Sequence, residues 1–312
     1  MCTSLLIHPE ELDSVWLDQL KQANVKTLGL HPVGGKNAHE TLQNMLERFD
    51  SPEYKLLLDQ AVRMGIDITC EMHALRYLLP QAQLEMHPHW QRINRQGGRS
   101  TDYNFCCSSQ EALDYVAQSV VSLLRRLPFT PRRVALWLDD ASDAFCHCEK
   151  CAHLSPSDQQ LIILNAMLDA LRAVYPDITL PYLAYYEALP APTQIKQHEG
   201  IYLQFAPYKR DITRPINNPD SPENCRQHQH LSSLLNLFGQ KDATVLDYWY
   251  DNSLFSGYQK PPKELHVDHR VVEADIAYYR SLGFQRISSF ACYLGQDYRM
   301  LWGLPDLSAF RV

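Results

Sequence analysis

Short apolar runs alternate with amphipathic stretches along the whole chain. The runs predict strands, and they cover residues 4–8, 25–31, 66–73, 134–138, 180–187, 200–205, 243–251 and 286–293. Between them, apolar residues recur every three or four positions, as Leu12, Trp16 and Leu20 do, which predicts helices. Two helix starts are marked by Ser51-Pro52 and Ser155-Pro156, because serine caps a helix and proline suits its first position.

Strands that alternate with helices predict one α/β domain over residues 1–312, a single (β/α)8 TIM barrel. A doubly wound open sheet is the competing fold, and it normally has a glycine-rich phosphate loop after its first strand. Here the first strand ends in His8-Pro9-Glu10, without a glycine, which favours the barrel. Two connections are unusual: a long loop over residues 74–107, and a cysteine-rich loop over residues 141–154 after the fourth strand.

The carboxyl ends of the predicted strands carry acidic, histidine and aromatic residues. In a barrel of this kind the active site lies at these ends. Aromatic rings next to carboxylates suit a sugar, because a ring stacks on its apolar face while the acids bind its hydroxyl groups. We therefore expect a carbohydrate site here, with these candidate substrate-binding residues: His31, His73, Arg99, Tyr185, Trp249, Asp251 and Tyr293.

The fourth predicted strand ends abruptly in Asp139 and Asp140. Two adjacent carboxylates after a buried strand are costly unless they are paired or take part in chemistry. Successive strand side chains point to opposite sides, so only one of the two faces the barrel axis. We expect Asp140 to protonate a leaving group, because the chain leaves the strand there, and Asp139 to orient it. The second catalytic carboxylate is expected to be Glu187 or Asp247.

Three cysteines, Cys146, Cys148 and Cys151, follow within one tight turn. A zinc ion held by four ligands would need one more, and thiolate-only sites are typically structural. We therefore predict a closed structural zinc site. The alternatives are a redox pair formed by Cys148 and Cys151, or three free thiols. Cys107 is the predicted fourth ligand; the other candidates are Cys106, His147 and His153.

Four segments carry a family resemblance: Asn104-Phe-Cys-Cys-Ser-Ser109, Trp137-Leu-Asp-Asp140, Phe145-Cys-His-Cys-Glu-Lys-Cys151 and the strand from Tyr182 to Glu187. They resemble an uncharacterised barrel family, a domain of unknown function grouped with predicted glycoside hydrolases and related to α-glucuronidases and hexosaminidase-type barrels. Hexosaminidase-type barrels have an Asp-Glu pair after the fourth strand, where this chain has Asp139-Asp140. The α-glucuronidase relationship implies a uronic acid, whose carboxylate Arg99 would bind in bidentate fashion.

Three functions fit these residues. A glycoside hydrolase needs a proton donor and a second carboxylate on either side of the sugar bond. A non-catalytic carbohydrate-binding barrel would bind a sugar without turnover. A metal-dependent sugar isomerase or epimerase would lose activity on chelation, and its ligands would be His31, Glu71, His73 and Glu187. We expect the hydrolase first, then the binding barrel, then the isomerase.

The composition narrows the partners and the compartment. The chain has 29 basic and 36 acidic residues and a net charge of −7, which argues against a nucleic-acid partner. Long apolar runs are absent, so we expect no membrane-spanning helix. The first residues lack the pattern of a signal peptide, and nine cysteines, an odd number, favour reduced thiols; both predict a cytoplasmic location. The expected partner is a carbohydrate or another small molecule, and the sequence carries no signal of oligomeric state.

Overall fold

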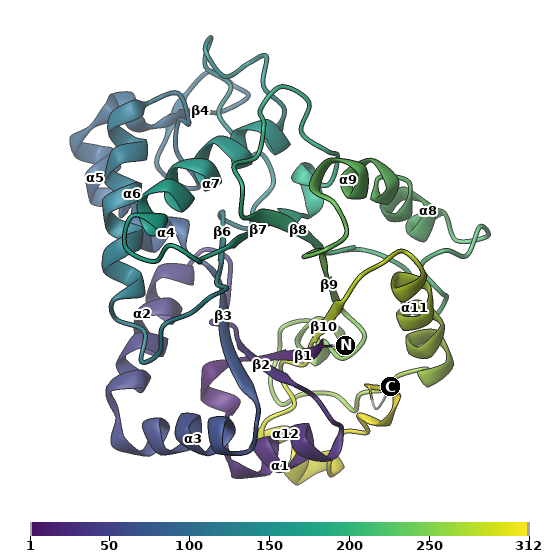
Figure 1. The fold of residues 1–312 in the computed structure, drawn as a ribbon. Helices are drawn as coiled ribbons and strands as arrows, with labels where there is room; N and C mark the ends of the chain where they lie inside the picture. The colour runs from purple at the N-terminus through teal and green to yellow at the C-terminus, as the bar shows by residue number, and fades with distance from the viewer. Residues whose placement is uncertain (1, 311–312) are drawn as a thin grey trace.

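The computed structural model describes residues 2–310, and its eight parallel strands form one sheet that curls into a barrel with helices on its outer face (Figure 1). The strands are β1 (Cys2–Ile7), β2 (Thr27–Leu30), β3 (Asp67–His73), β6 (Ala135–Trp137), β7 (Leu180–Ala184), β8 (Ile201–Phe205), β9 (Thr244–Asp247) and β10 (Arg286–Phe290). Every predicted strand is present. Three of them end several residues earlier than predicted, at Ala184, Asp247 and Phe290, because the chain there turns out of the sheet into loops and short helices.

The strand order is β6-β3-β2-β1-β10-β9-β8-β7. β1 pairs in parallel with β10, so the first and last strands are neighbours, as a closed barrel requires. The two ends of the sheet meet between β6 and β7. There Arg133 and Thr179 form a parallel bridge, and the Thr179 amide donates a hydrogen bond of 3.0 Å to the carbonyl of Arg132. The fold is therefore the predicted (β/α)8 barrel and not a doubly wound open sheet.

The helices begin where the sequence signals indicate. The hydroxyl of Ser51 accepts a hydrogen bond from the Tyr54 amide (3.2 Å), and that of Ser155 accepts one from the Asp158 amide (3.1 Å). The longer helices are α1 (Ser14–Gln22), α2 (Ala38–Asp50), α3 (Pro52–Arg63), α6 (Gln110–Leu124), α7 (Pro156–Arg172), α8 (Pro222–His228), α9 (Leu231–Phe238), α11 (His269–Ser281) and α12 (Gln296–Trp302). The shorter helical segments are α4 (Leu75–Leu78), α5 (Gln81–Met86), α10 (Asn252–Phe255), η1 (Pro9–Glu11), η2 (Pro88–Trp90), η3 (Tyr186–Ala188) and η4 (Ser308–Phe310).

Strand side chains alternate between the barrel axis and the surrounding helices. Leu136 and Leu138 belong to the large core between sheet and helices, whereas Trp137 belongs to a separate inner cluster. That inner cluster consists of Leu6, Ala135, Trp137, Leu183, Ala206, Leu246, Tyr248, Phe290 and Cys292. Gly29 also faces Leu6: a Cβ at this position would lie 2.7 Å from the Leu6 side chain, so only glycine fits without displacement. The alternation of side chains along each strand therefore decides which residues face the barrel axis.

The stretch 74–107, predicted as a long loop, contains local structure. It includes α4, α5, η2 and an antiparallel hairpin of β4 (Arg92–Ile93) and β5 (Arg99–Ser100). The buried guanidinium of Arg92 holds the hairpin to the returning chain, because it donates to the Asp102 carboxylate (2.8 Å) and to the Tyr103 carbonyl (3.0 Å). The hairpin lies on the same side of the barrel as α5, α6 and α7 (Figure 1).

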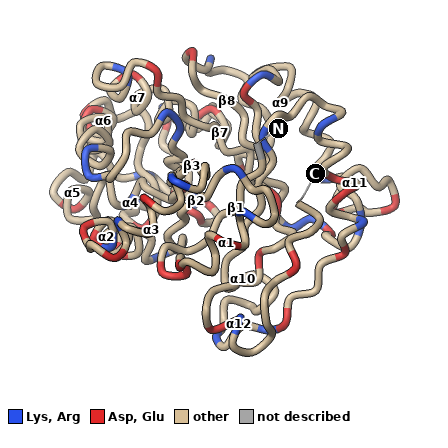
Figure 2. Tube along the Cα trace, turned by 60° about the horizontal axis from the view of Figure 1, so that its bottom comes forward, with Lys and Arg blue, Asp and Glu red and all other residues tan. Residues whose placement is uncertain are grey.

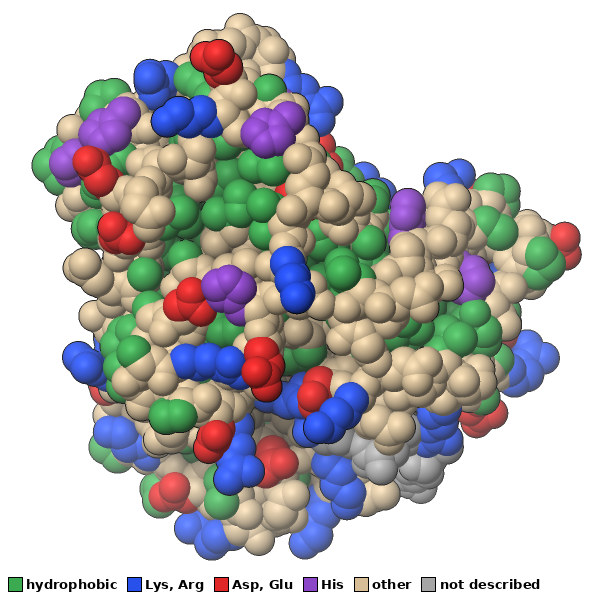
Figure 3. All heavy atoms as spheres, turned by 45° about the horizontal axis from the view of Figure 1, so that its top comes forward, with side chains coloured by type: hydrophobic (Ala, Val, Ile, Leu, Met, Phe, Trp, Pro, Cys, Tyr) green, Lys and Arg blue, Asp and Glu red, His purple; other side chains and the backbone are tan. Residues whose placement is uncertain are grey.

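Acidic and basic residues are mixed along the chain. Figure 2 shows both signs on neighbouring turns of the outer helices, and Figure 3 shows lysine and arginine side chains beside aspartate and glutamate on the face in view. Within residues 2–310, no helix combines the length and the apolar character needed to cross a bilayer.

Candidate functional site

A cavity of about 560 Å³ opens at the carboxyl ends of the strands. Aromatic rings make up much of its wall: Trp137, Tyr185, Tyr208, Tyr248, Tyr258, Phe290 and Tyr293. Of the residues that the sequence nominated, the following line this cavity: His31, His73, Asp140, Tyr185, Asp251 and Tyr293. The others, which are Asp139, Glu187, Asp247, Arg99, Trp249 and the cysteines, lie outside the lining. We call this space the mouth cavity.

Three histidines follow one another around the rim, at the ends of β1, β2 and β3. The Nδ1 atom of each lies within hydrogen-bond distance of a backbone carbonyl oxygen. That of His8 lies 2.8 Å from the His31 carbonyl, that of His31 lies 2.8 Å from the Glu71 carbonyl, and that of His73 lies 2.6 Å from the Leu138 carbonyl. A carbonyl oxygen only accepts, so each Nδ1 must carry the hydrogen. Burial lowers the pKa of His8 and of His31, which keeps these rings neutral and leaves Nε2 as an acceptor.

Two carboxylates lie in the wall of the mouth cavity. Asp140 is exposed to solvent and accepts a hydrogen bond of 2.9 Å from the Tyr185 hydroxyl. Asp251 is buried and caps α10, where it accepts from the Ser253 hydroxyl (2.5 Å) and the Leu254 amide (3.3 Å). Burial raises the pKa of Asp251, although these donors oppose the effect. The cavity therefore holds one solvated acid and one acid that binds its proton more tightly than usual.

Asp139 has a different position from its neighbour. Its carboxylate accepts a hydrogen bond from the backbone amide of Asn104 (2.8 Å), and the backbone amide of Asp139 donates to the side-chain oxygen of Asn104 (3.0 Å). This reciprocal pair joins the end of β6 to the segment before α6. Burial raises the pKa of Asp139, and the Asn104 hydrogen bond opposes this effect. The contacts of Asp139 are thus structural, outside the mouth cavity.

Asp247 and Trp249 point away from the barrel axis. Their neighbours Leu246 and Tyr248 belong to the inner cluster, so strand alternation turns Asp247 and Trp249 towards the helices. The Asp247 carboxylate lies 2.8 Å from the Arg210 guanidinium and accepts from the Tyr279 hydroxyl (3.0 Å), fully shielded from solvent. The indole of Trp249 donates to Asp275 (2.9 Å), which Arg210 also contacts at 2.8 Å. The sequence analysis placed Asp247 and Trp249 at the mouth of the barrel, and the structure shows that this placement is wrong for both.

Glu187 and Arg99 also lie outside the mouth cavity. The Glu187 carboxylate accepts hydrogen bonds from the Arg95 guanidinium (3.1 Å) and from the Asp143 backbone amide (3.1 Å). It therefore connects η3 with the β4–β5 hairpin and with the loop after β6. Arg95 contacts the Asp143 carboxylate as well (3.0 Å). The Arg99 side chain is exposed and donates to the Pro88 carbonyl (2.5 Å). Sequence reasoning singled out Arg99 and missed the role of Arg95.

The four ligands proposed for a sugar isomerase do not converge. Glu71 extends into the barrel, where its carboxylate accepts from the Gln204 amide (2.7 Å) and lines a second cavity at the opposite end. Glu187 is held by Arg95, while His31 and His73 remain at the mouth. Across residues 2–310, the one group of three or more histidine, cysteine or acidic residues with metal-binding spacing is a set of cysteines.

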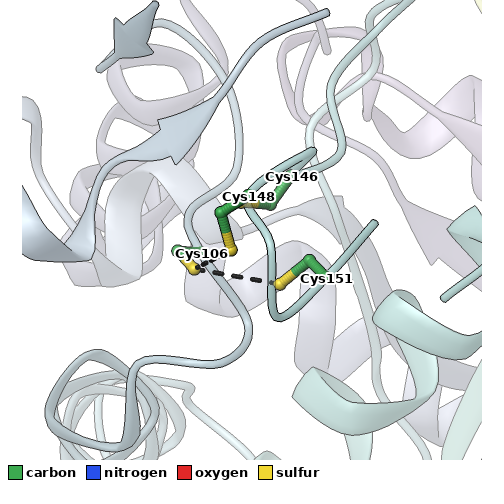
Figure 4. Close-up of side chains that lie close together, drawn as sticks. All are labelled: Cys106, Cys146, Cys148 and Cys151. Atoms are coloured by element: carbon green, nitrogen blue, oxygen red, sulfur yellow. Dashed lines mark hydrogen bonds between the residues drawn. The ribbon is translucent and has the colours of Figure 1, made fainter. Parts of the chain in front are cut away.

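Those cysteines are Cys106, Cys146, Cys148 and Cys151, which point toward one another between two loops (Figure 4). Their sulfur atoms all lie within 4.8 Å of one another. The predicted fourth member, Cys107, is therefore replaced by its neighbour. The Cys107 thiol lies 3.6 Å from that of Cys151 and donates to the Gln159 side chain (3.7 Å). Hydrogen bonds from Cys146 and Cys151 lower the pKa of the Cys106 thiol.

Several residues of the mouth cavity escaped the sequence analysis, among them Tyr248, Tyr258 and Gly34. Strand alternation places Tyr248 on the face opposite to Asp247 and Trp249, but the sequence does not tell which of the two faces the barrel axis. Tyr258 and Gly34 come from loops whose paths have no local signature. Tyr258 and Tyr293 both have positive φ values, 58° and 62°, which bulky residues rarely adopt and which often occur at functional sites.

Comparison with known proteins bears on the fold and the family. A family model described as "Domain of unknown function (DUF4838)" matches residues 41–294. Among curated proteins there is no match. A mutant of the O-GlcNAc hydrolase from Thermobaculum terrenum superposes with a TM-score of 0.50 at 12% identity, covering 95% of this chain and 54% of that one.

Two further solved structures are similar. A β-galactosidase from the psychrophilic Marinomonas ef1 has a TM-score of 0.52 at 12% identity, over 93% of this chain and 54% of that one. A glycoside hydrolase family 20 β-N-acetylglucosaminidase has a TM-score of 0.51 at 8% identity, over 99% of this chain and 67% of that one. The chain thus spans about half the length of the first two proteins. At these identities the likeness establishes a shared barrel fold.

Proposed function

Because this chain belongs to the family described as a domain of unknown function (DUF4838) and has a barrel fold shared with glycoside hydrolases, we propose that it binds and hydrolyses a carbohydrate in the mouth cavity. The observation that carries the proposal is the pair Asp140 and Asp251, two carboxylates in one cavity walled by aromatic rings. Hydrolysis of a glycosidic bond needs two such acids, one as proton donor and one as nucleophile or base.

The wall supports sugar binding. Tyr185 and Tyr208 lie with ring centroids 5.3 Å apart and Tyr248 lies 5.7 Å from Tyr208, with the rings tilted by 43° and 54°, so three neighbouring aromatic rings line this part of the wall. Such rings stack against the apolar face of a pyranose ring. The Nε2 atoms of His8 and His31 would accept hydrogen bonds from hydroxyl groups, because both rings are neutral and protonated on Nδ1.

The environments of the two acids support different roles. Asp251 is buried with a raised pKa, which suits the proton donor. Asp140 is solvated and held by Tyr185, which suits the nucleophile or base. This assignment revises the sequence-based one, in which Asp140 donated the proton with help from Asp139. Glu187 and Asp247 are not proposed as the second acid, because both are engaged in ion pairs away from the cavity.

The uronic acid implied by the family resemblance requires a cation near the cavity. Arg99 donates to Pro88 outside the lining. Lys209 also lies outside the lining but is next to it, since its Nζ lies 4.8 Å from the ring centre of Tyr186 and 5.5 Å from that of the wall residue Tyr208. We therefore assign the carboxylate of a uronic acid to Lys209. Binding of a uronic acid and of its neutral parent sugar should differ in the wild type, and Lys209→Ala should remove the difference whereas Arg99→Ala should retain it.

The test of hydrolysis is turnover of a panel of aryl glycosides. Asp251→Asn and Asp140→Asn should each lower turnover about 10²–10⁴-fold, the usual cost of losing a general acid or base. Asparagine still caps a helix, so Asp251→Asn should keep α10 in place. Glu187→Gln is the matched control, an acid at the same end of the barrel but outside the cavity, and it should stay near wild-type turnover. A wild-type protein that binds sugars but turns over none of the panel would refute hydrolysis and leave the carbohydrate-binding barrel.

A further inference from the structure

We propose that Cys106, Cys146, Cys148 and Cys151 bind one zinc ion in a closed structural site that joins the β4–β5 hairpin region to the loop after β6. The site lies apart from the mouth cavity, and the inference does not depend on the proposed hydrolase activity.

The spacing of the sulfur atoms fits a single tetrahedral metal ion. A zinc–sulfur bond is about 2.3 Å, so the sulfurs at the corners of a regular tetrahedron lie about 3.8 Å apart. Cys106 lies 3.6 Å from Cys148 and 3.8 Å from Cys151, and all four sulfurs are within 4.8 Å of one another. An iron–sulfur cluster would hold its cysteines farther apart, because several metal and sulfide atoms must fit between them. The set is therefore sized for one ion.

The surroundings favour zinc in a structural role. Cys106, Cys146 and Cys151 are buried and Cys148 is partly buried, and all four are free thiols. Four soft thiolate donors without a histidine or carboxylate complete the coordination of zinc and leave no position for a catalytic water. Without a cation, ionisation of one thiol opposes ionisation of the next, because buried negative charges repel. A divalent ion removes this conflict.

The ligands come from two segments of the chain that already contact each other through hydrogen bonds. Cys106 precedes α6, and its amide donates to the Trp90 carbonyl (2.9 Å). The other three lie in the loop after β6. There the Cys146 sulfur accepts from the Ile93 amide (3.4 Å), and the His147 amide donates to the Ile93 carbonyl (2.8 Å). Bound zinc would stabilise these contacts and the short β4–β5 hairpin that lies between them in the chain.

The same site would steady the segment that carries the acid pair. Asn104, two residues before Cys106, forms the reciprocal hydrogen bonds with Asp139. On the other side of the acid pair, Cys146 begins the cysteine turn. The metal would therefore anchor the chain both at Asn104 and beyond Asp140.

The first experiment is metal analysis of the full chain, purified without a metal-affinity column. We expect about one zinc per chain, and titration with a mercurial should release the zinc as the four ligand thiols are modified. Replacement by cobalt should produce the visible absorption of tetrahedral thiolate coordination. These measurements need no variant, so they remain decisive if a substituted chain does not fold.

The second experiment compares neighbouring cysteines. Cys106→Ser and Cys148→Ser should lose most of the bound zinc, whereas Cys107→Ser and the exposed Cys225→Ser should retain it. Zinc-free wild-type protein, iron in place of zinc, or a Cys148–Cys151 disulfide in freshly purified protein would overturn the proposal. Zinc loss on Cys107→Ser with retention on Cys106→Ser would overturn the ligand assignment.

Discussion

Replacing Arg210 by methionine should expose how the barrel depends on one buried cation. The Arg210 side chain is 1% exposed, and one of its nitrogen atoms lies 2.8 Å from both Asp247 and Asp275, whose side chains are fully buried. Asp247 lies at the end of β9 and Asp275 in α11, so the cation joins the barrel to an outer helix. Methionine retains the apolar stem of arginine and removes only the charge and the donors.

The expected cost follows from the charges that remain. Removal of one partner from a buried ion pair costs about 3–5 kcal/mol, because the other charge stays buried without compensation. Here two carboxylates are left facing each other. Each retains other donors, Tyr279 for Asp247 (3.0 Å) and Trp249 for Asp275 (2.9 Å), so we expect the lower part of this range.

The loss should depend on pH. Burial already raises the pKa of Asp275, and Arg210 opposes that rise. In Arg210→Met the folded-state pKa of Asp275 should therefore lie above its unfolded value. An acid with a raised folded-state pKa stabilises the fold at pH values below its unfolded pKa. This stabilisation is lost as the pH rises through the folded-state pKa. The difference from wild type should therefore shrink as the pH falls from about 8 to about 5.

The assay is urea unfolding followed by tryptophan fluorescence and circular dichroism at both pH values. Arg270→Met is the matched control, because Arg270 contacts Asp268 at 3.0 Å on the surface, and it should unfold like the wild type. A triple variant that adds Asp247→Asn and Asp275→Asn should recover part of the loss, since it removes the uncompensated charges. If Arg210→Met unfolds at the same urea concentration as Arg270→Met at both pH values, the reasoning is refuted.

Two further predictions concern the barrel interior and the wall of the mouth cavity. Burial raises the pKa of Glu71 to about 7 from 4.5, so the neutral form stabilises the fold below pH 4.5 and this contribution is lost as the pH rises through about 7. Glu71→Gln should flatten the fall in the free energy of unfolding over that range, by up to about 3 kcal/mol, as urea unfolding would measure; an unchanged profile would contradict the shift. A Cβ at Gly34 would lie 2.7 Å from the His73 ring. Gly34→Ala should therefore displace this wall residue and lower turnover of the aryl glycosides by up to about 10²-fold, and unaltered turnover would place the sugar elsewhere.

The local pattern of the sequence was sufficient to predict the barrel. Apolar runs such as 134–138 and 286–293 identify strands, and serine–proline pairs identify helix starts, because both signals depend on residues close together in the chain. The rule that chemistry lies at the carboxyl ends of barrel strands then led to His31, His73, Asp140 and Asp251, all of which line the cavity.

Side-chain direction was not decided by the sequence. The first residues after a strand follow no fixed alternation, so the pair Asp139-Asp140 could not be resolved until the turn was known. The structure holds Asp139 against Asn104 and leaves Asp140 in the mouth cavity. At β9 the alternation was readable but its phase was not, and the structure turns Asp247 towards Arg210.

Contacts between distant segments were also beyond the sequence. The spacing of Cys146, Cys148 and Cys151 marks a cluster by itself, because three thiols in one turn must lie close together. Cys106 and Cys107 are adjacent and chemically identical, and only the packing of the segment before α6 against the loop after β6 selects Cys106. Local spacing determines which groups are available, whereas the path of the chain between distant segments determines which of them meet, because that path depends on the packing of the whole barrel.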